Sequence, residues 1–169
     1  MTEQTDLRAE LEASHEESFA WAVRCCRGDR TDAEDVLHQS YEKVLDGRAR
    51  FQGRSAFRTW LFGVIRLTAR EHARRQWVTG RRIERWWRER EPEPEAAAGP
   101  DEALTRRLER ALAGLSGRQR EVLHLVFYQD LTIEAAAEVL GMPVGTARTH
   151  YQRGKHRLRK RLGEEGATE

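Results

Sequence analysis

The sequence predicts an all-α protein in which a flexible acidic linker joins two small helical domains, the second of them a helix-turn-helix. Apolar residues recur at helical spacing through most of the chain, and no alternating run is long enough to indicate a strand. Residues 91–102 hold three of the four prolines and five acidic residues, a composition that cannot bury a core. We therefore expect a first domain at residues 1–90, a linker at 91–103 and a second domain at 104–169.

Several helices are expected in the first domain. The first ends near Gly28, and its apolar positions are Leu11, Phe19, Trp21, Ala22 and Cys25 or Cys26. The second, which Thr31 or Asp32 can cap, carries Val36, Leu37, Tyr41, Val44 and Leu45. A basic, aromatic connector at residues 48–55 precedes a third helix, in which Phe57, Trp60 and Phe62 are spaced as core residues. In residues 83–90, the spacing of Ile83, Trp86 and Trp87 predicts a helix that packs on this domain, with contact to DNA or a membrane surface as the alternative.

The second domain begins with a helical pattern whose apolar stripe consists of Leu104, Leu108, Ala111, Leu112 and Leu115. Ser116 and Gln119 have the spacing of a capping box, which starts the next helix. Thr132 can cap a further helix, whose apolar positions are Ile133, Ala136, Ala137, Val139 and Leu140. Gly141 can adopt the left-handed backbone geometry that ends a helix, and Pro143 favours the first turn of the helix that follows.

The helix after Pro143 is strongly basic, and its cationic residues are Arg148, Arg153, Lys155, Arg157, Arg159, Lys160 and Arg161. No acidic residue lies between Val139 and Gly163, and the phosphate backbone of duplex DNA is the natural complement of such a helix. The pattern therefore predicts a helix-turn-helix that binds DNA, with a solvated amphipathic helix pair as the alternative.

The charge of the chain is segregated, which its formal net value of +2 conceals. Residues 1–47 hold twelve acidic and five basic residues, whereas residues 48–90 hold thirteen arginines and three glutamates. This change suggests two kinds of partner surface. No apolar stretch is long enough to span a membrane and the N-terminus lacks a signal-peptide pattern, so we expect a cytoplasmic protein without membrane insertion.

Neither the cysteines nor the histidines predict a metal or another cofactor. Cys25 and Cys26 are adjacent, and neighbours in a helix point too far apart for an easy disulfide or a shared metal site. We interpret them as packed thiols, with a redox sensor as the alternative. The six histidines lack metal-ligand spacing, and the motifs assemble no clustered carboxylates or paired nucleophile and base that would indicate an enzyme.

Three segments in a particular order carry a family resemblance. They are DAEDVLHQSYEKVL at residues 32–45, FQGRSAFRTWLFGVIR at residues 51–66 and, after the acidic linker, LSGRQREVLHLVFYQDLTIEAAAEVLGMPVGTARTHYQRGKHRL at residues 115–158. Together they closely resemble the extracytoplasmic-function (ECF) sigma factors, the two-domain sigma factors of bacterial RNA polymerase. The resemblance covers roughly residues 15–162.

In that family, the first segment docks on the coiled coil of the polymerase's largest subunit. The resemblance therefore implies a set of residues that bind core polymerase, namely Asp32, Asp35, His38, Gln39 and Tyr41. The family usually has Gln-Glu at the positions of His38 and Gln39, which leaves the detail of this docking open. For Asp32 and Glu34, helix capping and compensation of the helix dipole are an alternative role.

The second segment resembles the part of these proteins that melts the −10 promoter element and reads it as single-stranded DNA. Capture of unstacked bases needs aromatic rings or a shaped pocket beside a cationic groove. The residues implied here are Phe51, Gln52, Arg54, Ser55, Arg58, Arg66, Leu67 and Arg70. The family often has Asn at the position of Leu67, and we expect this departure to change the −10 preference.

The third segment resembles the domain that reads the −35 element as duplex DNA. The positions that match the base readers are Arg148, Thr149, Gln152 and Arg153. Arginine can grip a guanine edge and glutamine an adenine edge, whereas Lys155, Arg157 and Lys160 are expected to hold phosphates. His150 stands where the family usually has Arg, which would weaken a phosphate contact or make it sensitive to pH. Tyr151 is expected in the core.

The resemblance implies a sigma factor that binds core RNA polymerase at its coiled coil and flap, recognises both promoter elements and helps to melt DNA, without a cofactor and without catalysing a reaction. It also implies an anti-sigma factor as a partner, and a linker that threads toward the active-site cleft, although a plain tether is an alternative for the linker. Two other functions are alternatives to a sigma factor. A helix-turn-helix regulator acting alone would leave the acidic helix at 32–45 unexplained, and a sigma mimic that titrates an anti-sigma factor would not need a basic recognition helix.

Overall fold

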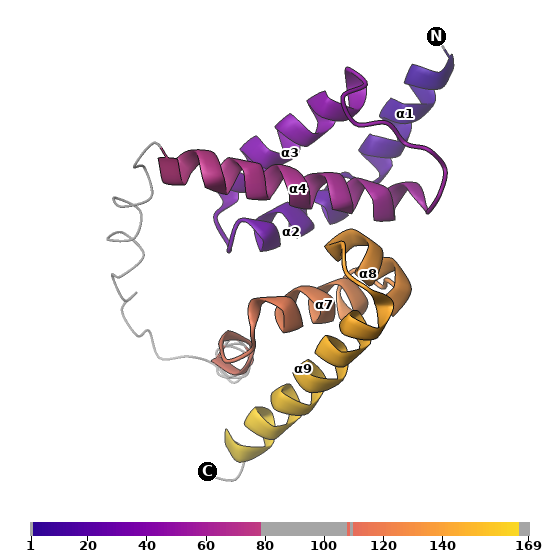
Figure 1. Ribbon diagram of the computed structural model, residues 1–169. Helices are drawn as coiled ribbons and strands as arrows, with labels where there is room; N and C mark the ends of the chain where they lie inside the picture. The colour runs from indigo at the N-terminus through magenta and orange to yellow at the C-terminus, as the bar shows by residue number, and fades with distance from the viewer. Residues whose placement is uncertain (1, 79–107, 109, 166–169) are drawn as a thin grey trace. The chain divides into compact units, whose positions relative to one another are not determined.

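Figure 1 shows the computed structural model of the protein, which describes residues 2–78, 108 and 110–165. Every regular element within these residues is a helix, and the chain divides into two compact units. The expected all-α class with two small helical domains is confirmed. The linker at 91–103 and the helix at 83–90, both expected from the sequence, lie outside the described residues. In the part of the chain that is described, no helix is both long and apolar enough to cross a membrane.

The described part of the N-terminal unit contains α1 (Thr2–Ala13), α2 (His15–Cys25), α3 (Arg30–Leu45) and α4 (Phe57–Val78). The expectation of one continuous first helix is wrong. Ser14 separates α1 from α2 with a backbone ψ of 5°, far from the helical value of about −42°. The expected cap of α3 is also wrong, because Asp29 takes this place instead of Thr31 or Asp32. The Asp29 carboxylate accepts a 2.8 Å hydrogen bond from the backbone N–H of Asp32.

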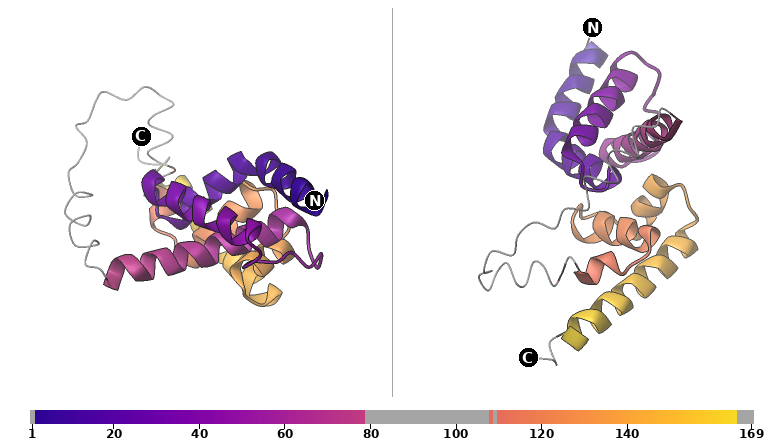
Figure 2. Two further views of the ribbon diagram at one scale, coloured as in Figure 1. Left: turned by 90° about the horizontal axis from the view of Figure 1, so that it is seen from above. Right: turned by 90° about the vertical axis from the view of Figure 1, so that its left-hand side faces the viewer.

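Trp21 of α2 lies at the centre of the core of this unit and is fully buried. Its ring stacks on Phe62 of α4 with the ring centroids 6.0 Å apart, and its indole N–H donates to the Phe62 carbonyl oxygen over 3.0 Å. The polar edge of the indole is thus satisfied inside the core. Helix α4 packs against both α2 and α3 (Figure 1 and Figure 2), which buries one side of α4 and leaves the other for solvent and partners.

Phe57 and Trp60 were expected in the core but lie at its edge, where both are half-buried. Phe51, from the connector before α4, packs on them with its ring centroid 5.5 Å from that of Phe57 and 5.3 Å from that of Trp60. The reason is helical periodicity. Leu61 and Ile65 occupy the middle of the buried side of α4, so that residues 57 and 60 fall on its flank.

The C-terminal part of the chain contains α7 (Gly117–Phe127), α8 (Ile133–Leu140) and α9 (Val144–Glu165). The predicted capping box at the start of α7 is confirmed. The Ser116 hydroxyl accepts from the backbone N–H of Gln119 over 3.4 Å, and the Gln119 side chain accepts from the backbone N–H of Ser116 over 3.2 Å. In the apolar stripe before α7, Ala111 and Leu115 are buried, but Leu108 is exposed, contrary to expectation.

The turn between α8 and α9 has the predicted geometry. The Thr132 hydroxyl accepts a 3.1 Å hydrogen bond from the backbone N–H of Ala135, and Gly141 ends α8 with a φ of +60°. Ala137 and Ala147 are both buried, as small residues between closely packed helices should be. Helix α9 also approaches α7 closely, because a Cβ atom at Gly154 would lie 3.0 Å from Leu123 Cδ1. This contact fixes the first half of α9 against α7.

Candidate functional site

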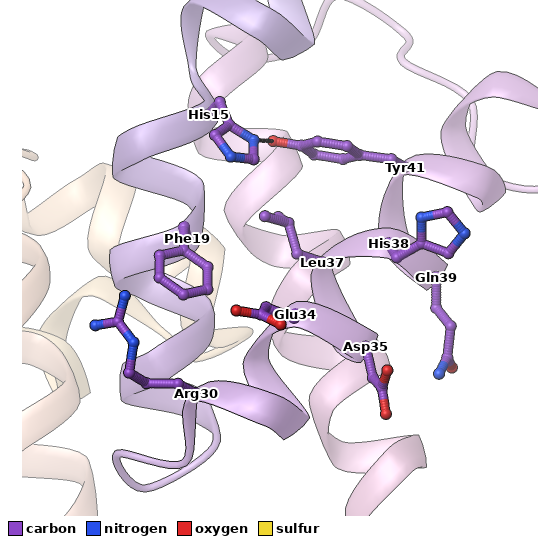
Figure 3. A pocket seen from close by; sticks show the side chains of 9 residues that line it. All are labelled: His15, Phe19, Arg30, Glu34, Asp35, Leu37, His38, Gln39 and Tyr41. Carbon is purple, nitrogen blue, oxygen red and sulfur yellow. Dashed lines mark hydrogen bonds between the residues drawn. The ribbon is translucent and has the colours of Figure 1, made fainter.

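An open groove of about 580 Å³ contains four of the five residues expected to bind polymerase. Figure 3 shows its lining, which comes from α2 and α3 and comprises His15, Phe19, Arg30, Glu34, Asp35, Leu37, His38, Gln39 and Tyr41. We call it the α2–α3 groove. The four expected residues in it are Asp35, His38, Gln39 and Tyr41.

The α2–α3 groove combines apolar and acidic side chains. Leu37 is buried and Phe19 half-buried, whereas Glu34 and Asp35 are exposed. The guanidinium of Arg30 lies 5.0 Å from the centroid of the Phe19 ring and holds that ring in place from one side. An apolar strip bordered by carboxylates is suited to an amphipathic helix that carries basic residues.

Two histidines flank Tyr41 in this groove. The Tyr41 hydroxyl lies 3.4 Å from His15 Nδ1, a contact that Figure 3 marks between α3 and α2. Burial raises the pKa of the Tyr41 phenol above its usual value of 10.0, so the phenol stays protonated at neutral pH. One turn earlier, His38 is exposed, and its Nε2 lies 3.3 Å from the carboxylate of Glu42.

Asp32, the fifth residue of the expected polymerase-binding set, does not line the groove. Its side chain is only 15% exposed and reaches toward α4. The side-chain amide of Gln76 donates to Asp32 Oδ1 over 2.7 Å, and Nε2 of His72 lies 3.2 Å from the same oxygen. The Gln76 amide nitrogen and His72 Nε2 are themselves 2.8 Å apart. Asp32 is therefore part of a polar cluster that ties α3 to α4, a partnership that sequence reasoning missed.

The connector carries the first group of residues expected at the −10 element. Phe51, Gln52 and Arg54 are exposed and Ser55 is half-buried, so the cationic and aromatic character of this segment is presented to solvent. Arg58, in the first turn of α4, forms a 2.8 Å ion pair with Glu17 of α2. This pair leaves Arg58 restrained before any DNA contact.

The second group lies further along α4 and is divided between its two sides. Leu67 is 57% exposed and Arg70 is exposed. Arg66 is only 5% exposed, because a step of one residue turns the side chain by about 100° around the helix and places it on the packed side. The structure thus brings Leu67 and Arg70 to the surface and leaves Arg66 inside the unit, where its guanidinium is not presented to DNA.

The residues expected at the −35 element project from α9. Arg148, Thr149, Gln152 and Arg153 are all exposed, and their spacing places them on one side of the helix. The Thr149 hydroxyl donates to the carbonyl oxygen of Gly145 over 2.9 Å, which leaves its lone pairs available as acceptors. Arg148 forms a 3.2 Å ion pair with Glu134 of α8, so one reader is linked to the first helix of the motif.

The remaining α9 residues lie nearer to α7. Arg157 is exposed and its guanidinium lies 3.5 Å from Gln119 Oε1, while Lys155 is half-buried with its ammonium 5.6 Å from the centroid of the Tyr151 ring. Tyr151 was expected in the core but is half-buried, and it stacks on the exposed Phe127 of α7 with ring centroids 5.8 Å apart. The stack lies at the edge of the packed interface and supports α9 from one flank.

Comparison with known proteins identifies the family of this chain. The family model for sigma-70 region 2 matches residues 12–79, and the model for sigma-70 region 4 matches residues 105–158. The chain is 30% identical over 135 residues to the RNA polymerase sigma factor CarQ of Myxococcus xanthus, a match that covers 78% of this chain and 75% of that protein. It is 30% identical over 141 residues to the ECF RNA polymerase sigma factor SigX of Bacillus subtilis, covering 79% and 72% respectively.

Among solved structures, the sigma factor RpoE in complex with the anti-sigma factor NepR from Bartonella quintana has the same fold, with a TM-score of 0.63 and 22% identity. That match covers 94% of this chain and 97% of the other. Two family models in the expected order, and two relatives that are 30% identical over at least 72% of their length, together decide the assignment. The chain belongs to the ECF RNA polymerase sigma factors.

Proposed function

We propose that this sigma factor, which directs RNA polymerase to promoters for transcription initiation, divides its contacts among three surfaces. The exposed face of α9 reads the −35 element as duplex, the connector and the exposed side of α4 capture the −10 element as single strand, and the α2–α3 groove holds core polymerase. The α9 face carries the proposal, because two arginines and a glutamine stand exposed on one side of a helix and the sequence has no acidic residue between 139 and 163.

At the −35 element, α9 enters the major groove with the side that bears Arg148, Gln152 and Arg153. Arginine can donate two parallel hydrogen bonds to a guanine edge, and glutamine can pair with an adenine edge. Lys155 and Arg157 hold phosphates on the flank and set the register of the helix without reading sequence. The close packing at Gly154 keeps this helix fixed against α7, so that its readers meet the groove in one orientation.

At the −10 element, the cost of unstacking bases is offset by surfaces that bind them. Phe51 presents an exposed aromatic ring supported from below by Phe57 and Trp60. Arg54 supplies positive charge in the connector and Arg70 supplies it on α4, where the phosphates of a separated strand can pass. Leu67 offers only apolar contact at its position, which favours a base preference different from that of relatives with Asn there.

The α2–α3 groove is proposed to receive the coiled coil of the polymerase's largest subunit. Its apolar strip and exposed carboxylates at Glu34 and Asp35 complement an amphipathic helix with basic residues. Asp32 contributes to this docking by holding α3 against α4 and not by direct contact. An anti-sigma factor that covers this groove and the α9 face would block both activities, and the similar RpoE forms a complex with the anti-sigma factor NepR.

The polymerase performs the chemistry of RNA synthesis, and this protein acts by binding, without a catalytic role or cofactor of its own. Its partners, core polymerase and promoter DNA, place it in the cytoplasm. Two roles remain proposed for the acidic stretch from Glu91 to Glu102, a tether between the domains or a segment that threads toward the active-site cleft of the polymerase.

Substitution of the α9 readers tests the proposal. With holoenzyme reconstituted from this protein and core polymerase, Arg148→Ala or Arg153→Ala should weaken binding to the cognate promoter by about 1–3 kcal/mol and relax the preference at one base pair. Arg157→Ala is the matched control, because loss of a phosphate contact weakens binding to all sequences equally and lowers the salt dependence. Equal losses on all sequences for Arg148→Ala and Arg153→Ala would contradict their role as readers.

A further inference from the structure

Four residues of α4 form an exposed stripe that extends beyond the part of the helix assigned to the −10 element. They are Leu67, Arg70, Arg74 and Trp77, and we call them the α4 stripe. Steps of three, four and three residues bring these side chains to one side of the helix. All four are exposed, whereas the opposite side of the same turns is packed, with Ala69 buried and His72 half-buried.

Trp77 is the distinctive member of the α4 stripe, because its side chain is 70% exposed, the largest exposed fraction among the large hydrophobic residues that the structure describes. An indole is the aromatic side chain with the largest surface for stacking, and every base has a π-face on which it can stack. Within a duplex these faces are covered by neighbouring base pairs. An exposed indole on a DNA-binding helix is therefore suited to an unpaired base.

The charge around Trp77 complements a nucleic acid strand. Arg74 and Arg70 lie on the same stripe, about one and two turns before Trp77 respectively, at positions where a phosphate backbone can follow the helix. Glu71 is the acidic residue next to the stripe, and its carboxylate is engaged by Lys43 at 2.7 Å on the side of α3. An aromatic platform combined with cations in line is the arrangement by which proteins hold single strands without reading them.

From this arrangement we propose that Trp77 stacks on an unpaired base of the separated promoter strand, while Arg74 holds an adjacent phosphate. The proposal rests on the proposed function of α4 at the −10 element and extends the strand-binding surface by two turns toward the end of the helix. Trp77 would supply stacking energy that Leu67, as an aliphatic residue, supplies only weakly.

Fork-junction DNA tests the proposal in the holoenzyme. The probe is a labelled promoter fragment that is duplex through the −35 element and single-stranded across and around the −10 element, and binding is measured by fluorescence anisotropy. Trp77→Ala should weaken binding by about 5- to 150-fold, the equivalent of one stacked base. Trp77→Phe should restore most of the affinity. Tyr128→Ala, which removes an aromatic residue of similar exposure, 68%, at the end of α7, is the matched control and should leave binding to the single-stranded part unchanged.

A scan with abasic sites along the single strand separates stacking from a general structural effect. At one position, removal of the base and Trp77→Ala should each weaken binding, and their combination should cost no more than either alone. Additive losses at every position would overturn the proposal, because no single base would then be coupled to Trp77.

Arg70→Ala distinguishes failure of this inference from failure of the proposed function. If Arg70→Ala weakens binding to the fork junction and Trp77→Ala behaves like Tyr128→Ala, the stacking role is wrong and α4 still binds the strand. If neither Arg70→Ala nor Trp77→Ala weakens binding, the assignment of α4 to the −10 element is itself wrong, and the inference falls with it.

Discussion

Asp32→Ala should destabilise the N-terminal unit through the interface between α3 and α4, and not by removing a polymerase contact. The carboxylate is 15% exposed and accepts a 2.7 Å hydrogen bond from Gln76, while His72 lies 3.2 Å from the same oxygen. Truncation deprives the Gln76 amide of its acceptor in a largely desolvated place. Because the residues involved are 40 and 44 positions apart in sequence, the loss affects tertiary packing more than the helix itself.

The expected magnitude follows from the type of hydrogen bond. A hydrogen bond to a charged group contributes about 1.5–3 kcal/mol, and burial of the partners keeps the loss near the upper part of this range. For a unit of this size, each kcal/mol lowers Tm by about 4–8 °C, so a loss of about 2–3 kcal/mol in Asp32→Ala should lower it by about 8–24 °C. Asp32→Asn keeps an acceptor oxygen for Gln76 and loses the charge, and should cost about 1 kcal/mol.

Urea unfolding followed by circular dichroism measures the free energy of unfolding, and Asp35→Ala is the matched control on the same helix. Asp35 is exposed in the α2–α3 groove, so its removal should change stability by less than about 0.5 kcal/mol and weaken binding to core polymerase. At a temperature where both variants are folded, Asp32→Ala should bind core polymerase better than Asp35→Ala. If Asp32→Ala keeps its stability but loses polymerase binding, then Asp32 contacts the polymerase directly and its structural role between α3 and α4 is wrong.

Three further predictions concern single interactions. Lys43 holds the pKa of Glu71 below its usual value of 4.5 through a hydrogen bond, so Glu71→Gln should lower the free energy of unfolding near neutral pH by at most about 1 kcal/mol. This difference from the parent protein should disappear as the pH falls through the folded pKa of Glu71. A difference that grows in acid would contradict this sign. Gly141→Ala should lower the free energy of unfolding by about 1 kcal/mol from backbone strain alone, since φ is +60° and a Cβ atom would meet nothing within 4 Å. Unchanged stability in thermal unfolding would contradict this, because the turn would then relax without strain. Glu134→Gln should raise the affinity for random duplex DNA by about two- to fivefold at low salt, because it removes a negative charge and frees Arg148 from its 3.2 Å ion pair. Reduced affinity in a filter-binding titration would contradict a DNA-binding role for Arg148.

The local signals in this chain could be predicted because they depend on residues a few positions apart. Ser116 and Gln119 form the expected capping box, and Gly141 adopts the expected left-handed conformation. At the start of α3, several capping residues stand close together, and sequence alone did not decide among them. Asp29 takes the position because the turn after α2 ends there, with Gly28 at a φ of +93°.

Contacts between helices could not be predicted from such local signals. The period of a helix predicts which side is buried, but not which residue of a partner helix meets it, so the cluster of Asp32, His72 and Gln76 was missed. The same limit applies to the site residues. Arg66 and Leu67 are neighbours with a shared expectation, yet one is buried and the other is exposed because α4 packs on α2 and α3 together. The roles assigned to individual residues on these surfaces stay predictions.

Transcription with purified core RNA polymerase, measured with and without this protein on a library of genomic fragments, tests the central claim most directly. RNA 5′ ends are sequenced, and the Arg148→Ala variant is included in parallel. We expect new start sites that share two upstream motifs at a constant spacing, and a change in the −35 motif alone when Arg148 is replaced. Failure of the protein to bind core polymerase, or start sites that are the same with and without it, would show that the protein does not act as a sigma factor.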